Sequence, residues 1–342
     1  MEAMPRLHPT PPPFAFSKLL QRPAAVALAA AGLLALGGCP QKENAVASQG
    51  TSAPAAALAA PAASTTDAPA GAARSHTSAT LRRADLMALV FPDSQSPNAT
   101  PQQPDIVSLP EIGNDGKTVP GSAAEQTARV SPREVVKLDD THAVILTETV
   151  PVDDRGQAMD GHASGAWLGA YFFEQGADGW KLTSRSDAVD YLGFMGNLGT
   201  TKVERVAPQR FALTITSGSC WQGYCGQWLS VYALDAGKVR VVTPSIALSA
   251  SNEGADEACE KVLKSQKPEE PANGECYDIS GTPSFVAGAD DTTPGEMRIA
   301  FKGERTASAK SSRVDTVDST LVYAWRKGAY VLTEGRNPVP SF

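Results

Sequence analysis

The sequence predicts a mainly β protein, an antiparallel meander of three-stranded units, either an incomplete propeller-like stack or a sandwich, with a few short helices. Apolar and polar residues alternate in three separate segments, at 211–216, 297–302 and 321–326. This two-residue period is that of half-buried strands. Short turns rich in Gly, Asp and Lys precede further apolar runs, at residues 176–179, 235–238 and 326–328. Turns of this kind join antiparallel strands.

The first 38 residues have the features of a signal peptide. Lys18 and Arg22 precede an apolar run of 13 residues at 24–36. As a helix rising ~1.5 Å per residue, this run would span about 20 Å, too short for the ~30 Å hydrocarbon core of a bilayer. A basic region before a short apolar run is typical of a signal peptide rather than a membrane-spanning helix.

The apolar run ends in Leu36-Gly37-Gly38-Cys39. This tetrapeptide resembles the lipobox of bacterial lipoproteins, in which an aliphatic residue and two small residues precede a cysteine. The resemblance implies that Cys39 is lipidated and is the first mature residue, so that acyl chains hold the protein at the membrane. The absence of Asp after Cys39 implies an outer-membrane location facing the periplasm. The alternative is an ordinary secretory signal with an unrelated cysteine.

Residues 39–80 are rich in Ala, Pro and Ser and contain no aromatic residue. Such a segment cannot bury enough apolar surface to offset its chain entropy. We therefore expect a disordered tether with a mean reach of about 35 Å. The globular domain is expected to cover residues 81–342.

The start of that domain is predicted to be a short amphipathic helix at residues 81–91, ended by Pro92. Residues 92–130 show no clear period and are predicted to be irregular. Residues 135–145 favour a hairpin that turns at Asp139-Asp140, although a helix starting near Ser131 is the alternative.

Three units follow, each with a strand, a long loop, an aromatic-bearing strand, a tight turn and a third strand. They cover residues 143–184, 211–243 and 297–333. A helical insertion is expected at residues 254–264, between the second and third units.

Four cysteines remain after Cys39, an even number in an exported protein, which favours two disulfides. Three connectivities are possible, and the simplest pairs sequence neighbours. A zinc site is the rival, but the spacings do not match those of a zinc ribbon. The four residues are Cys220, Cys225, Cys259 and Cys276.

The charge balance argues against two classes of partner. The chain carries −7, and because residues 1–38 carry +2, the remainder carries −9. Nucleic-acid binding and docking on anionic lipid both depend on clustered Lys and Arg. We therefore expect no nucleic-acid partner, and the sequence indicates no cofactor.

The sequence lacks the common motifs of catalytic and metal-binding sites. We find no nucleophile elbow, phosphate-binding loop, dinucleotide fingerprint or zinc-protease motif. The loop at 153–162 gathers three carboxylates, including Asp154, and the imidazole of His162. A cation could accept such ligands, but a solvated acidic loop is the simpler interpretation. His142, at the start of a strand, is interpreted as structural.

The segment at 217–228 is the most distinctive. Trp221 and Tyr224 lie inside the Cys220–Cys225 interval, and a clipped loop bearing aromatic residues loses little entropy on binding. The alternative is that both rings fold back over the sheet. If the long loops emerge at one rim, they bring Asp154, His162, Arg305 and Arg313 toward the same edge.

Residues 142–342 resemble the β-rich domains of proteobacterial envelope lipoproteins that have no assigned activity. The shared features are Gly-Trp-Lys-Leu after a hairpin turn, here 179–182, and Trp-Gln-Gly-Tyr, here 221–224. We expect a non-catalytic binding or scaffolding protein with a possible protein partner in the envelope. The alternatives are an immunity or inhibitor protein against a toxin or wall hydrolase, and an extracytoplasmic hydrolase.

Overall fold

The computed structural model describes residues 76–94, 104–114, 116–266 and 270–341 of the chain. The expected signal peptide, Cys39 and most of the expected tether lie outside the described residues. Ser78 is described, and its amide and carbonyl pair with those of Trp180 at 2.9 and 2.7 Å. The paired structure therefore includes residues just ahead of 81.

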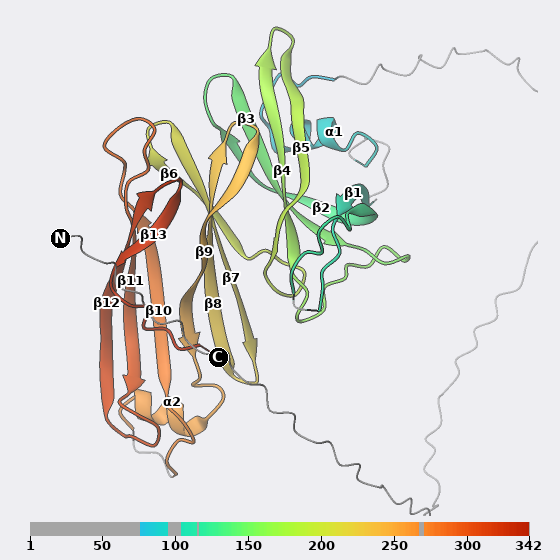
Figure 1. The fold of residues 1–342 in the computed structure, drawn as a ribbon. Helices are drawn as coiled ribbons and strands as arrows, with labels where there is room; N and C mark the ends of the chain where they lie inside the picture. The colour runs from blue at the N-terminus through green and yellow to red at the C-terminus, as the bar shows by residue number, and fades with distance from the viewer. Residues whose placement is uncertain (1–75, 95–103, 115, 267–269, 342) are drawn as a thin grey trace, which may run out of the picture. The chain divides into compact units, whose positions relative to one another are not determined.

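The described residues form two antiparallel sheets in which the strands follow chain order (Figure 1). The first sheet has five strands: β1 Asp105–Leu109, β2 Ala124–Lys137, β3 His142–Pro151, β4 Ala166–Gly176 and β5 Gly179–Leu192. The second has eight: β6 Thr200–Ala207, β7 Arg210–Trp221, β8 Tyr224–Asp235, β9 Lys238–Ser251, β10 Tyr277–Phe285, β11 Met297–Thr306, β12 Val314–Arg326 and β13 Ala329–Glu334. Two short helices accompany them, α1 Arg83–Val90 and α2 Glu257–Leu263.

The mainly β, antiparallel meander predicted from the sequence is confirmed. The three predicted units correspond to β3–β5, β7–β9 and β11–β13. The long loop predicted in the second unit is wrong, because β7 and β8 continue to Trp221 and Tyr224 and a two-residue turn joins them. β10 pairs with both β9 and β11, so the second and third units continue into one sheet. The predicted helices correspond to α1 and α2.

The prediction for residues 92–130 is wrong in part, because this segment contains β1 and the first half of β2. The β2–β3 hairpin prediction is confirmed, with residues 138–141 as its turn. The alternative of a helix near Ser131 is wrong, because residues 131–137 belong to β2 and pair with β3. Pro132 lies at a register shift of this pairing. Irregular positions of this kind tolerate the missing amide of proline.

β3 and β4 are buried on both faces, which explains their long apolar runs. Side chains such as Ile145 and Tyr171 pack with α1, whose Leu86 and Met87 are fully buried. The opposite face, through Leu146 and Leu168, packs against β7 and β8 of the second sheet, as two faces pack in a β-sandwich.

The other face of the second sheet encloses its own core. This core draws buried side chains from β6 through β13, among them Met297, Ile299 and Phe301. The sheet is curled, as the approach of β13 to β9 and of β10 to β6 shows, because these strands are not neighbours in the sheet. The connection at 286–296 covers the edge of β6, where the amides of Gly288 and Gly295 donate to the carbonyl of Val206.

Two disulfides join Cys220 to Cys225 and Cys259 to Cys276. This is the neighbour pairing that the sequence favours. Disulfides persist in oxidising compartments, so the protein belongs to an environment outside the cytosol. In the described part of the chain, neither helix is long and apolar enough to cross a membrane.

Candidate functional site

The end of the β7–β8 hairpin forms the centre of the candidate site. Gln222 and Gly223 make the turn with φ of 49° and 85°, and a two-residue turn with both φ positive suits the twist of a hairpin. A Cβ on Gly223 would lie 2.1 Å from the backbone carbon of Gly254. The turn therefore rests directly on the connection between β9 and α2.

Covalent and hydrogen-bonded ties hold this end of the sheet. Cys220 and Cys225 lie opposite each other with Cα atoms 4.0 Å apart. The second disulfide fastens α2 next to the start of β10. Buried Asn252 accepts from the amide of Tyr277 at 2.9 Å and donates to the carbonyl of Glu275 at 2.8 Å. The hairpin end is thus preorganised.

Trp221 and Tyr224 present apolar surface at this rigid end. They are paired residues across the hairpin, so their side chains emerge as neighbours on one face. Their exposed fractions are 60% and 45%. The alternative that both rings fold back over the sheet as a small core is not what the structure has.

His162 packs beside Trp221, although the two come from different sheets. The ring centroids are 4.7 Å apart at an interplanar angle of 71°. His162 Nε2 lies 3.2 Å from the carbonyl oxygen of Cys220. Because a carbonyl oxygen only accepts, Nε2 carries the proton in this contact. The predicted meeting of His162 with the hairpin loop is therefore present.

Two methionines that the sequence analysis did not single out lie on adjoining segments. Gly196 donates to the carbonyl of Ser164 at 2.9 Å, so the turn after β5 touches the loop that carries His162. Met159 and Met195 on these segments are 58% and 54% exposed. The only sequence signal for Met195 is the glycine on either side of Phe194-Met195, which marks a turn.

We call the five residues Met159, His162, Met195, Trp221 and Tyr224 the aromatic tip. Four of the ten exposed large apolar side chains among the described residues belong to it. The other six are spread over five separate segments. Trp, Tyr and Met are residue types that protein interfaces favour, which makes the aromatic tip a candidate interaction surface.

Asp154, the remaining predicted binding residue, is exposed in the turn after β3. Its neighbour Asp153 accepts from the amides of Arg155 and Gln157, both at 2.9 Å, which makes its carboxylate part of the turn. Across the described ranges, no three His, Cys, Asp or Glu residues lie together as a metal site would need.

Arg305 and Arg313 were predicted to lie at the same edge as these loops, and no contact among the described residues joins either arginine to the aromatic tip. The connection from β11 to β12 lies at the same end of the second sheet as the β7–β8 turn and α2, because alternate turns of a meander share an end (Figure 1). Arg313 is ion-paired with Asp315 at 3.2 Å.

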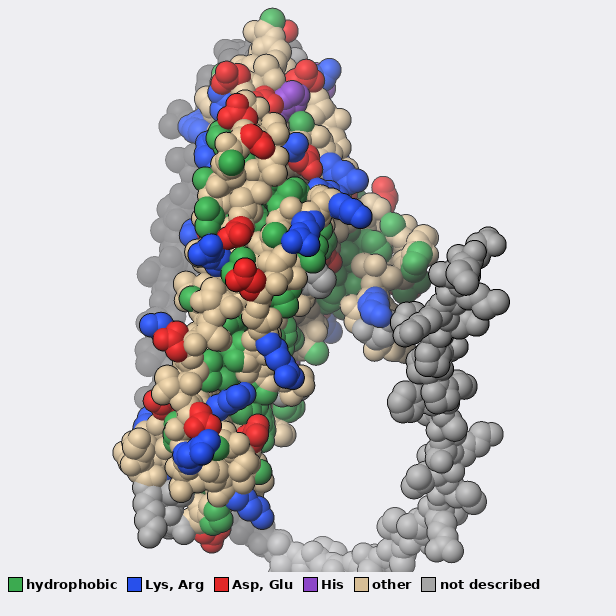
Figure 2. Space-filling view, turned by 60° about the vertical axis from the view of Figure 1, so that its left-hand side comes forward, with side chains coloured by type: hydrophobic (Ala, Val, Ile, Leu, Met, Phe, Trp, Pro, Cys, Tyr) green, Lys and Arg blue, Asp and Glu red, His purple; other side chains and the backbone are tan. Residues whose placement is uncertain are grey.

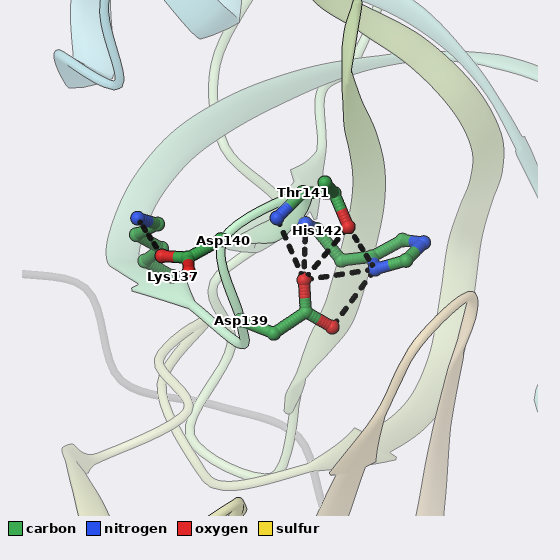
Figure 3. A network of polar contacts seen from close by, with 5 residues as sticks. All are labelled: Lys137, Asp139, Asp140, Thr141 and His142. Carbon is green, nitrogen blue, oxygen red and sulfur yellow. Dashed lines mark hydrogen bonds and ion pairs between the residues drawn. The ribbon is translucent and has the colours of Figure 1, made fainter.

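His142 is the first residue of β3, next to the β2–β3 turn and not at the aromatic tip, and Figure 3 shows its polar network. Asp139 accepts from the amides of Thr141 and His142 at 2.7 and 2.8 Å, and its other oxygen lies 2.8 Å from His142 Nδ1. Although partial burial opposes it, these hydrogen bonds lower the pKa of Asp139 to about 2. The cluster stabilises a turn, in keeping with a structural role.

Comparisons of the chain with protein-family models, with curated proteins and with solved structures found no match. The function therefore has to be inferred from the geometry of the aromatic tip and from the signals in the sequence.

Proposed function

We propose that this protein is a lipid-anchored protein of the cell envelope whose β domain binds another protein through the aromatic tip. The observation that carries the proposal is the exposure of Trp221 and Tyr224 on a disulfide-closed hairpin. A large aromatic side chain that is already held in place loses little conformational entropy when a partner covers it. Such residues contribute most of the binding energy at protein interfaces.

The segments around the aromatic tip carry a net negative charge, which supports a partner with a basic surface. The hairpin segment at 217–228 has no charged residue, whereas the loop at 152–165 carries three aspartates and one arginine. The connection at 252–276 carries seven carboxylates and three lysines, and the one at 307–313 carries two cations. An apolar centre within a net acidic surround fits a protein partner with a basic rim. Elsewhere, Figure 2 shows charges of both signs interspersed.

The membrane anchor rests on Leu36-Gly37-Gly38-Cys39 and on the redox state of the other cysteines. Four of the five cysteines are paired with each other, which leaves Cys39 as the one thiol available for acylation. The Ala- and Pro-rich segment that follows would let the domain reach a partner some 35 Å from the membrane. The lack of Asp after Cys39 supports the periplasmic face of the outer membrane.

Co-purification tests the binding proposal. The native chain and its Trp221→Ala/Tyr224→Ala variant are cross-linked in intact cells, and the attached proteins are compared by mass spectrometry. We expect one partner that is lost with the double variant but retained with Leu332→Ala, a control on β13 whose apolar side chain is about as exposed as that of Tyr224. The same set of proteins with all three chains would contradict the proposal.

Fractionation tests the anchor separately. We expect Cys39→Ala to move the protein from the membrane fraction to the soluble fraction, and the native amino-terminal peptide to carry the mass of acyl chains. An unmodified Cys39 with residues 1–38 still attached would contradict lipidation, whatever the result at the aromatic tip.

A second candidate, an immunity or inhibitor protein, is favoured by one observation, the net acidic surround of the tip. A basic toxin or wall hydrolase would be the partner, and electrostatic attraction would speed its association. We expect its association rate constant to fall steeply between low and physiological salt, and its activity to be blocked by the native chain but not by Trp221→Ala/Tyr224→Ala.

A further inference from the structure

The opposite end of the second sheet encloses a cavity that the proposed function does not use. Its volume is about 250 Å³, and its walls come from β6, β7, β8, β9, β12, β13 and the connection at 286–296. Turns at this end join β8 to β9 and β12 to β13, whereas the aromatic tip lies at the other end of the same strands.

The connection at 286–296 is docked firmly enough to form one wall. Gly288 and Gly295 donate to the carbonyl of Val206 at 3.0 and 3.2 Å, and Gln209 donates to the carbonyl of Asp291 at 2.9 Å. Arg210 Nε donates to the carbonyl of Thr292 at 3.2 Å. The cavity is therefore built by hydrogen-bonded backbone and does not depend on a free loop.

One part of the cavity lining has an excess of positive charge. Arg210 Nη1 is hydrogen-bonded to one carboxylate oxygen of Asp235. Arg240 lies with Nη2 4.0 Å from the other oxygen, which is beyond hydrogen-bond distance, while its Nη1 donates to the carbonyl of Gly328. Two guanidinium groups thus share one carboxylate, and Arg240 Nη2 retains donor capacity.

Aromatic rings line the cavity as well. The rings of Trp325 and Tyr330 meet edge to face at 5.1 Å. Tyr330 is 3% exposed, and its buried hydroxyl has no hydrogen-bond partner among the described residues. An unpaired buried hydroxyl destabilises the folded state. Burial also raises the pKa of Tyr330 well above its usual value, so the hydroxyl keeps its proton.

We propose that this cavity is a binding site for a small aromatic carboxylate, whose carboxylate pairs with Arg240 and Arg210 and whose ring lies against Trp325 and Tyr330. Guanidinium groups bind carboxylates through charge-assisted hydrogen bonds. A cavity of about 250 Å³ lies at the small end of ligand pockets, so the ligand that we propose is a single-ring compound.

Calorimetric titration of the native, oxidised chain with three matched probes tests the proposal. The probes are 4-hydroxyphenylacetate, phenylacetate without the ring hydroxyl, and 4-hydroxyphenylacetamide without the charge. We expect both carboxylates to bind with similar affinity, and 4-hydroxyphenylacetamide to bind at least about tenfold more weakly than the corresponding acid. Equal affinity for the acid and its amide, or no binding of any probe at millimolar concentration, would overturn the proposal.

Two variants separate the roles of the lining residues. Arg240→Gln should lower the affinity for 4-hydroxyphenylacetate about tenfold and leave the affinity for the amide unchanged. Arg313 is an exposed arginine at the other end of the sheet, so Arg313→Gln should change neither affinity. Tyr330→Phe should bind both acids as the native chain does and keep its stability, because the Tyr330 hydroxyl is covered by protein atoms and has no partner among the described residues. A loss of affinity for 4-hydroxyphenylacetate alone would contradict this placement of the hydroxyl. Trp221→Ala should bind the probes normally, which keeps this proposal independent of the aromatic tip.

Discussion

Single side chains close the turns that set the register of the sheets, and Asp139 is the clearest case. Its carboxylate accepts hydrogen bonds from the amides of Thr141 and His142 and from the His142 ring at the β2–β3 turn. Each of these donors favours the ionised carboxylate over the neutral acid. The turn is therefore linked to pH through one group.

Acid should weaken this turn in a defined window. The pKa of Asp139 is lowered from 3.8 to about 2, so its stabilising effect is complete above pH ~4 and is lost as the pH falls through 2. The effect on global stability should be small, because more than half of the Asp139 side chain is exposed and solvent screens it.

The measurement is the chemical shift of the Asp139 carboxyl carbon as a function of pH, with an expected midpoint near 2. His142→Ala should raise that midpoint by removing one donor. A midpoint at 3.8 in the native chain would show that the hydrogen bonds in Figure 3 do not form in solution.

At the scale of elements, the connection between β9 and β10, which contains α2, depends on the Cys259–Cys276 disulfide for its fold. α2 is only seven residues long, and helices of this length are marginal in water without tertiary support. Its buried side chains form a small cluster with Cys259 and Cys276, both almost fully buried. The disulfide therefore supports a segment that has little core of its own.

Removing the Cys259–Cys276 disulfide should lower the free energy of unfolding more than removing the Cys220–Cys225 disulfide. In the chain-entropy model the 17-residue separation of Cys259 and Cys276 corresponds to about 3 kcal/mol, and the five-residue separation of Cys220 and Cys225 to about 2 kcal/mol. Urea unfolding of the two double Cys→Ala variants measures both losses. A larger loss for the hairpin pair would contradict the model.

The sequence predicts elements well where local pattern and tertiary burial agree. β11 alternates strictly over its first six residues, and its buried residues are the ones that the period assigns. The segment at 92–130 is the counterexample. β2 reads Ala-Glu-Gln-Thr-Ala-Arg-Val, with few apolar residues. Its strand conformation comes from pairing with β1 and β3, which a local pattern cannot reveal.

At the scale of the whole domain, the two sheets share one core and should unfold together. Leu146 and Leu168 of the first sheet pack with Leu213 and Tyr232 of the second. The Tyr232 hydroxyl also donates to Asp190 across this contact at 2.8 Å. Elements that share buried surface to this extent unfold cooperatively.

Tyr232→Phe should therefore destabilise both sheets at once. It leaves a carboxylate oxygen of Asp190 without its donor, which costs about 1–3 kcal/mol. We expect far-ultraviolet circular dichroism and tryptophan fluorescence to report one coincident urea transition, shifted to lower urea in the variant. Two separate transitions would contradict a shared core.

The sequence by itself determined the strand period and the turns, and it favoured the neighbour pairing of the cysteines, because each depends on residues close in the chain. The exposure of Trp221 and Tyr224, which the sequence left open, was decided by the structure. Only the tertiary structure decided that His162 and Met195 join the aromatic tip and that Arg210, Arg240 and Tyr330 line one cavity. These residues are brought together by the curl of the second sheet and by its packing on the first. That packing depends on side-chain complementarity between strands far apart in sequence, which no local period encodes.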